Sequence, residues 1–163
     1  LDGWLKDPRG FTDPVNARYW CELNAAWMAA IEAGAGSRWL IHEHALKALE
    51  PSLVDARFLS EGESYKICQG VAPVECGLHS HVGPRGSRGS LANLARIVER
   101  VNIAHGHGPG IREAAYMAGT LGRRDMAWSN KGPGDWAPAH ILTYPSGKRS
   151  LVTQWDDGRW RDQ

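Results

Sequence analysis

Residues 71–81 read VAPVECGLHSH, and residues 101–110 read VNIAHGHGPG. In each stretch a short apolar segment predicts a β-strand, from Val71 to Leu78 in the first and from Val101 to Ala104 in the second. Each predicted strand ends in two histidines separated by one small residue, and glycine and proline follow. Because open α/β sheets build their sites at the carboxyl ends of strands, the two pairs mark a candidate site.

The first pair is His79 and His81, and the second is His105 and His107. A neutral imidazole is the commonest transition-metal ligand among side chains, and small neighbours let the backbone approach an ion closely. The alternative for either pair alone is a polar surface loop. Two pairs after consecutive predicted strands favour a metal site.

The loop at 83–90 reads GPRGSRGS and leads into a helix predicted over about 90–100. Arg85 and Arg88 supply guanidinium groups that match phosphate oxygens, and the helix start supplies free backbone N–H groups. A solvated basic loop is the alternative. The position of the loop, two residues after His81, favours phosphate binding.

The remainder of the sequence, together with these two stretches, predicts a mixed α/β fold. A helix is expected over 14–33, because Asp13-Pro14 is a typical helix start and apolar residues recur at steps of four after it. A second helix is expected from Glu43 to Leu49, ended by Pro51. Further short strands are predicted at 38–41, 57–59, 64–68, 113–119, 125–129, 139–144 and 150–154. Residues 145–148 are expected to turn the last two strands into a hairpin.

Composition limits the class of protein. The 163 residues have a mass of 17.9 kDa, are 42% hydrophobic, and carry 19 basic and 18 acidic side chains for a net charge of +1. These values are typical of one globular domain without a strongly basic surface. Cys21, Cys68 and Cys76 form no CxxC pair, and no apolar run reaches a membrane-spanning length. We therefore expect a cytoplasmic protein with reduced thiols, no membrane partner and no signal peptide.

Three other histidines have weaker patterns. His42 and His44 flank Glu43 where a helix is expected to begin, and they are either a third metal-binding pair or surface residues. His140 lies in a predicted apolar strand, where a structural role is expected. The eight tryptophans are expected to anchor a core or an interface.

Several of these motifs, taken in order, resemble a known family. Leu78-His79-Ser80-His81 resembles the fourth motif of calcineurin-like metallophosphoesterases, and Ala104-His105-Gly106-His107 is similar to their closing Gly-His-Thr-His motif. Three further segments are similar to phage and bacterial members of the family: residues 86–90, residues 128–136 and the hairpin at 144–149.

The resemblance implies a hydrolase, a phosphatase or phosphodiesterase, that cleaves phosphate mono- or diesters at a centre of two divalent transition metal ions (Mn, Fe, Zn or Ni). By position, His79 and His105 would bind one ion and His107 the other. Arg85 or Arg88 would hold the phosphoryl oxygens, and His81 is left as a substrate contact. The implied fold is half of a four-layer αββα sandwich.

The family motifs that precede these histidines, with their aspartate and asparagine ligands, do not occur in residues 1–163. The resemblance therefore implies a single partial domain, the C-terminal half of the fold, inactive as an isolated fragment. An N-terminal half or a second chain would complete it. Two alternatives remain open. One is a non-catalytic binding or assembly module, and the other is a protein that processes or binds nucleic acid through Arg85, Arg88, Arg123 and Arg124.

Overall fold

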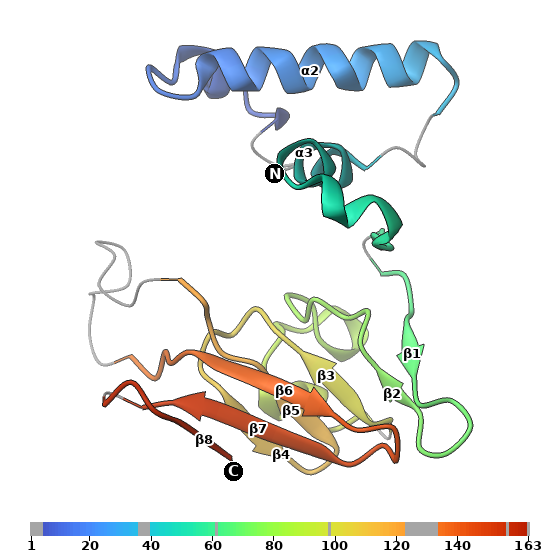
Figure 1. Ribbon diagram of the computed structural model, residues 1–163, viewed down its shortest axis with the longest axis vertical. Helices are drawn as coiled ribbons and strands as arrows, with labels where there is room; N and C mark the ends of the chain where they lie inside the picture. The colour runs from blue at the N-terminus through green and yellow to red at the C-terminus, as the bar shows by residue number, and fades with distance from the viewer. Residues whose placement is uncertain are drawn as a thin grey trace. The chain divides into compact units, whose positions relative to one another are not determined.

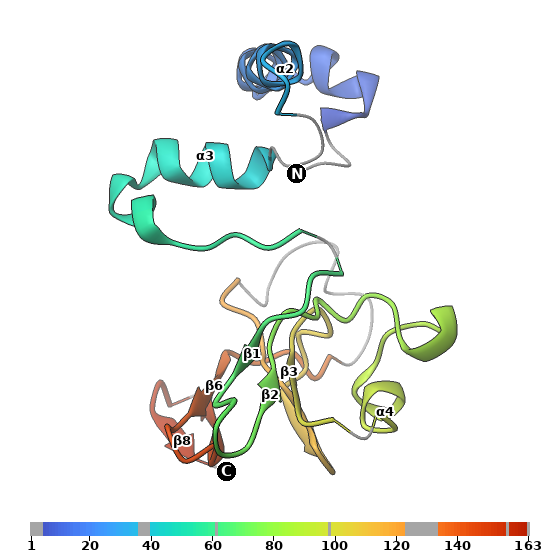
Figure 2. The same ribbon diagram turned by 90° about the vertical axis from the view of Figure 1, so that its right-hand side faces the viewer.

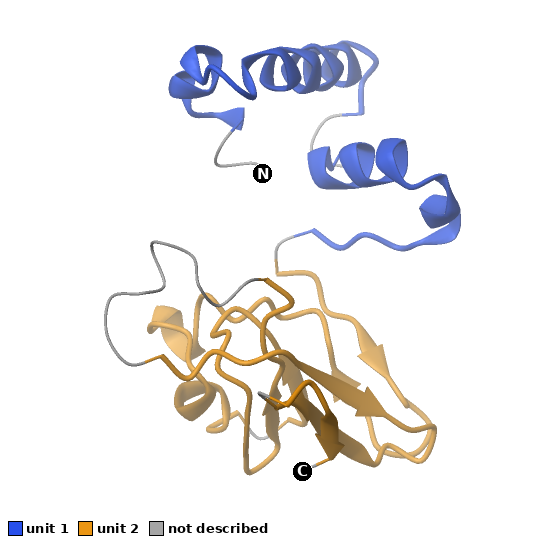
Figure 3. Cartoon of the chain, turned by 60° about the vertical axis from the view of Figure 1, so that its left-hand side comes forward, with its two compact units in different colours: residues 1–60 blue, residues 61–163 orange. Residues whose placement is uncertain are grey.

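The computed structural model describes residues 5–35, 40–60, 62–97, 99–122, 134–155 and 157–162. The chain divides into two compact units, Leu1–Ser60 and Glu61–Gln163 (Figure 3). The described residues form both helices and sheets, so the mixed α/β class is confirmed. The assignment of the whole chain to one partial sandwich domain stays a prediction. No helix in the described ranges has the length and hydropathy to cross a bilayer.

The long helix of the first unit confirms the prediction over 14–33. It is α2, Ala17–Glu32, and a turn at residues 14–16 precedes it (Figure 1). The Asp13 carboxylate accepts the backbone N–H groups of Val15 and Asn16 at 3.0 and 3.1 Å. Asp13 therefore caps this turn, as the Asp-Pro pair predicts, and the helix proper begins one turn later.

A small apolar core holds the rest of the first unit. α3, Ile41–Leu49, confirms the second predicted helix, and the short 3-10 helices η1, Pro8–Thr12, and η3, Pro51–Asp55, flank the pair. The strand predicted over 38–41 is wrong at Ile41, which begins α3 because its side chain packs into the core; residues 38 and 39 lie outside the described residues. The core consists of Leu5, Leu23, Ile41 and Ala45, with Trp20 and Trp27 packed against it.

The second unit is built on a five-stranded sheet of order β1-β2-β3-β5-β4. β2, β3 and β5 run parallel, and β1 and β4 are antiparallel to their neighbours. The strands are β1 Lys66–Ile67, β2 Val74–Glu75, β3 Val101–Ile103, β4 Gly110–Arg112 and β5 Ala115–Met117. Its core consists of Leu94, Ala95, Val101, Ile103, Ala115 and Met117. Since Leu94 and Ala95 come from α4, Leu91–Leu94, and its last turn, that helix covers one face of the sheet (Figure 2).

A three-stranded antiparallel sheet, β6-β7-β8, lies on the other side (Figure 2). It contains β6 Ala139–Thr143, β7 Arg149–Gln154 and β8 Trp160–Asp162. The hairpin turn predicted at 145–148 is confirmed: Tyr144 donates its N–H to the Lys148 carbonyl at 2.9 Å.

One buried side chain ties the two sheets together. The Arg149 guanidinium donates to the carbonyls of Val101 and Ala114 and to Asn102 Oδ1, at 2.8, 2.9 and 3.1 Å. It also lies 4.1 Å from the centroid of the Tyr116 ring. Burial is the main cause that lowers the pKa of this guanidinium from its ordinary value.

The other predicted elements are shorter than expected or differ. Residues 57–59 form no strand. The helix expected over 90–100 ends as α4 after Leu94, because Arg96 and Ile97 donate to carbonyls three residues back in a tight turn that leads toward β3. β4 and β8 were not predicted, and the strand expected at 125–129 lies outside the described residues.

Candidate functional site

Both predicted histidine pairs lie where the sequence analysis placed them, after neighbouring strands. β2 and β3 pair in parallel, with Glu75 opposite Val101. His79 and His81 follow β2, and His105 and His107 follow β3. Because parallel strands place their carboxyl ends at one edge of a sheet, the topology brings the two pairs to the same edge.

A buried carboxylate fixes the chain where β2 ends. Glu75 is 5% exposed, and its side chain accepts hydrogen bonds from the Ser64 hydroxyl and from the backbone N–H groups of Tyr65 and Gly77. Burial raises the pKa of Glu75, but these hydrogen bonds outweigh burial and hold the pKa below its ordinary value. The contacts anchor the segment that leads to His79.

The first histidine pair is held against the second by the serine between its members. Ser80 is 4% exposed, and its hydroxyl donates to the Ala104 carbonyl at 2.6 Å. On the other side, Gly89 packs against Ser80 so closely that a Cβ at position 89 would lie 1.6 Å from the Ser80 carbonyl oxygen. The Gly89 N–H also donates to the His81 carbonyl at 3.1 Å. Residues 79–81 are thus clamped from two sides.

Three imidazole rings lie together at this edge. The ring centroids of His79 and His105 are 4.9 Å apart, those of His79 and His81 are 5.5 Å apart, and those of His81 and His105 are 6.1 Å apart. His105 Nδ1 lies 3.1 Å from His79 Nε2, so one nitrogen carries the shared proton and the other accepts it. All three residues are exposed, so solutes reach the rings.

Two of the three separations are close to those of imidazoles that share one ion, and the third is longer. Three imidazoles that share a tetrahedral ion, at metal–nitrogen distances of about 2.0–2.1 Å, have ring centroids roughly 5–5.5 Å apart. As the side chains stand, no three His, Cys, Asp or Glu residues in the described part of the chain have donor atoms placed to hold a metal ion.

His107 has a different neighbour. Its ring meets the Trp136 ring edge-on, with centroids 4.3 Å apart. Its φ is 58°, that of His105 is 72°, and both lie in the left-handed region that is uncommon for residues other than glycine. The ring contacts therefore group His81 with His79 and His105. The roles expected of His107, as ligand of a second ion, and of His81, as substrate contact, stay predictions.

An acidic residue that the sequence analysis did not single out lies beside the second pair. The Asp135 carboxylate packs against buried Gly108, where a Cβ would lie 2.3 Å from Oδ2. The neighbouring Trp136 contacts His107. Residues 128–136 carried part of the family resemblance, but no spacing rule links Asp135 to the histidines some 30 residues before it.

The loop after His81 closes on itself. Val82 and Arg88 form an isolated antiparallel bridge, and the Gly83 N–H donates to the Ser87 carbonyl at 2.7 Å. Inside the loop, Pro84–Gly86 form the short turn η4, in which Arg85 has φ 57° and ψ 32°. Arg85 is thus presented at the tip of the loop, whereas Arg88 lies at its base.

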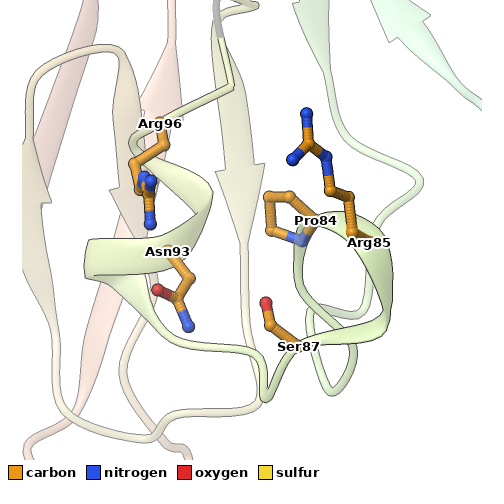
Figure 4. A pocket seen from close by; sticks show the side chains of 5 residues that line it. All are labelled: Pro84, Arg85, Ser87, Asn93 and Arg96. Atoms are coloured by element: carbon orange, nitrogen blue, oxygen red, sulfur yellow. The ribbon is translucent and has the colours of Figure 1, made fainter.

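A pocket of about 330 Å³ lies between this loop and α4 (Figure 4). The loop contributes Pro84, Arg85 and Ser87, and the opposite wall contributes Asn93 and Arg96. The sequence analysis predicted the anion-binding role of Arg85 but missed Asn93 and Arg96. Arg88 does not line the pocket.

The remaining candidates lie elsewhere. His42, in the first unit, packs against Phe58 with ring centroids 5.7 Å apart. The strand predicted around His140 is β6, but the residue is exposed and its ring lies 5.0 Å from that of Trp160. The three cysteines are free, and Cys21 is exposed. Arg123 and Arg124, named for nucleic-acid contacts, lie outside the described residues.

One relative bears on identity. The chain is 35% identical over 154 residues to Protein A1 of Escherichia phage T5, an alignment that covers 93% of this chain and 26% of that protein. The chain thus spans about a quarter of the length of the relative it matches. No protein-family model matches the chain, and no solved structure matches it.

Proposed function

We propose that this chain carries part of the metal centre of a metal-dependent phosphoesterase. The observation that supports the proposal most is the grouping of His79, His81 and His105, with ring centroids 4.9–6.1 Å apart at the carboxyl ends of β2 and β3. A pocket lined by two arginines, on the loop directly after His81, supports a phosphate ester as substrate.

In this proposal the three imidazoles hold one divalent transition ion, in place of the proton that His79 and His105 share. When bound, such an ion polarises a phosphoryl oxygen and lowers the pKa of bound water. Ser80 and Gly89 keep the first histidine pair in position. Of the two loop arginines, Arg88 lies at the base of the loop, paired with Val82 next to His81, and binds the non-bridging oxygens of the reacting phosphoryl group.

A second ion, expected from the family resemblance, would bind beside His107. Asp135, packed on Gly108, offers a carboxylate near that residue. The other oxygen ligands would come from the remainder of a longer protein or from a second chain, which is in keeping with a relative about four times the length of the aligned segment. We further propose that the protein acts in the cytoplasm.

Metal binding tests the first part of the proposal. The 163-residue chain is dialysed against Mn²⁺ or Zn²⁺, and its metal content is measured by elemental analysis. We expect one ion per chain. The changes His79→Ala, His81→Ala and His105→Ala should each lower the affinity for the metal ion by at least about 10- to 100-fold. That is the loss seen when a residue that only hydrogen-bonds to a metal ligand is removed.

His140→Ala is the matched control, because His140 is an exposed histidine in the same unit but packs on Trp160. Equal metal content in His105→Ala and in the unaltered chain would contradict the proposed site. Turnover of bis-p-nitrophenyl phosphate with added Mn²⁺, measured on a longer protein that contains this segment, then tests the reaction. No turnover by a protein that binds the ion would refute the phosphoesterase.

A second candidate function is a binding or assembly module that keeps one ion without catalysis. It is favoured by the finding that no three His, Cys, Asp or Glu side chains among the described residues are placed to hold a metal ion. In that case His105→Ala would lower the stability of the metal-loaded chain, and phosphate esters would remain intact at every metal concentration.

A further inference from the structure

We propose that the pocket between α4 and the loop at 83–88 binds a phosphate group on its own, apart from the phosphoryl group that would react at the histidines. Phosphate binding in this pocket does not depend on a phosphoesterase activity. A further consequence for the substrate rests on the proposed function. The substrate would carry at least two phosphate groups, one bound at the histidines and one bound in this pocket.

Charge is the first argument for the site. Arg85 and Arg96 line the same pocket, and its other lining residues are Pro84, Ser87 and Asn93, so no carboxylate among the described residues lines it. Neither arginine forms an ion pair with any residue that the structure describes. Two like charges at one pocket repel, and an anion between them removes that cost and gains charge-assisted hydrogen bonds.

The second argument is that both walls are fixed in advance. Asn93 Nδ2 donates to the Arg88 carbonyl at 2.8 Å, which ties α4 to the base of the loop. Ser90 Oγ accepts the Asn93 N–H at 3.1 Å and fixes the start of the helix. The loop has its own bonds, from Gly83 to Ser87 and from Gly86 back to Gly83, at 2.7 and 3.1 Å. The backbone of both walls is therefore ordered before a ligand binds, and only the two exposed arginine side chains have to be ordered on binding.

The lining also selects the chemical class of the ligand. It contains two guanidinium groups, an amide and a hydroxyl, and no aromatic side chain on which a base or sugar ring could stack. Guanidinium groups match the paired oxygens of phosphate. The volume of about 330 Å³ lies at the lower end of the range of small-molecule pockets. These features fit a phosphate or diphosphate group better than the organic part of a ligand.

The pocket lies within reach of the histidines along the chain. Arg85 lies four positions after His81, so their Cα atoms are at most about 14 Å apart even in a fully extended chain. The loop is closed at its base by the bond from Gly89 to the His81 carbonyl. This length sets the upper limit of the distance that a substrate with two phosphate groups has to span.

Binding to the metal-free chain tests the pocket without any reaction. Inorganic pyrophosphate is titrated into the dialysed 163-residue chain, and binding is measured by calorimetry. We expect Arg85→Gln and Arg96→Gln each to weaken binding by about 10- to 100-fold, as expected for loss of one charge-assisted interaction. Arg112→Gln, a change at an exposed arginine of β4, is the control and should leave the Kd unaltered.

Equal dissociation constants for Arg96→Gln and Arg112→Gln would overturn the site. A second readout locates the ligand: the side-chain amide resonance of Asn93 should shift on titration, and an unmoved resonance would also count against the pocket. Circular dichroism of each variant checks that the change leaves the fold intact.

Kinetics on a longer, metal-loaded protein test the consequence. Arg96→Gln should raise KM for adenosine diphosphate and leave KM for p-nitrophenyl phosphate, which has one phosphate, unaltered. An equal effect on both substrates, or none, would overturn the two-phosphate inference. Arginine-dependent pyrophosphate binding without hydrolysis of any ester would refute the phosphoesterase alone, and hydrolysis without Arg96-dependent binding would refute the pocket alone.

Discussion

Ser80 offers a direct test of how the histidine pairs are held together. The change Ser80→Ala removes a hydroxyl that is 4% exposed and that donates to the Ala104 carbonyl at 2.6 Å. A buried acceptor that loses its partner costs about 1–3 kcal/mol. The methyl group of alanine still fits, and the φ of 71° at this position disfavours both side chains alike. We therefore expect the free energy of unfolding to fall by about 1–3 kcal/mol.

Urea denaturation followed by circular dichroism measures this loss. Ser146→Ala is the control, because Ser146 is exposed and accepts only a 3.4 Å contact from the Lys148 N–H in the hairpin turn. If the hydroxyl also sets the spacing of the imidazoles, Ser80→Ala should weaken Zn²⁺ or Mn²⁺ binding by more than Ser146→Ala does. Equal stabilities of the two variants would refute the reasoning, since the hydrogen bond from Ser80 to Ala104 would then contribute nothing to stability.

Three further predictions follow from buried contacts. Arg149→Met should lower the free energy of unfolding by about 3–5 kcal/mol, because it removes three hydrogen bonds that a buried guanidinium donates. Arg161→Met on the exposed strand β8 should cost far less, and similar denaturation midpoints would contradict this role. Gly106→Ala should destabilise by about 1–3 kcal/mol, because its Cβ would lie 2.4 Å from Met117 Sδ. The same change in a Met117→Ala background should cost less, and an equal cost in both backgrounds would show that the sulfur is not the obstacle. Glu75 has a lowered pKa in the folded state, so its stabilising effect is present above its ordinary value of 4.5 and is lost as pH falls through the folded value. The stability difference between the unaltered chain and Glu75→Gln should therefore shrink from pH 6 to pH 3, and a constant difference would contradict the assigned pKa.

The sequence predicted the elements whose signals are local. Asp13-Pro14 predicted the start of α2, Pro51 predicted the end of α3, and residues 145–148 predicted the β6–β7 hairpin. These signals work because capping, proline geometry and tight turns depend on a few adjacent residues.

The predicted lengths were less accurate because they depend on tertiary contacts. The apolar residues recur at steps of four, yet their burial differs: Leu23 is 3% exposed, Ile31 is 50% exposed, and Val15, in the turn before α2, is 83% exposed. The helix after the loop stops at Leu94 because the chain tightens there and turns toward β3. The periodicity of apolar residues predicts neither the burial of each side chain nor the residue at which a helix ends.

The candidate site divides in the same way. Histidines at the ends of two strands were visible in the sequence, and so was Arg85 in its loop. Arg96 and Asp135 were not, because the first reaches the pocket only through the position of α4 and the second only through packing on Gly108. The choice of His81, rather than His107, as third member of the ring cluster also depends on side-chain placement.

The division of the chain at residue 60 has a practical consequence for mutational scanning. Every residue of the imidazole cluster and of the arginine pocket lies in the second unit. The two units have separate hydrophobic cores, so a departure from additivity between a substitution in α2 or α3 and one at the site would measure coupling between the units. A library that pairs the two regions would identify any residue of the helical unit whose substitution changes the effect of a substitution at the histidines.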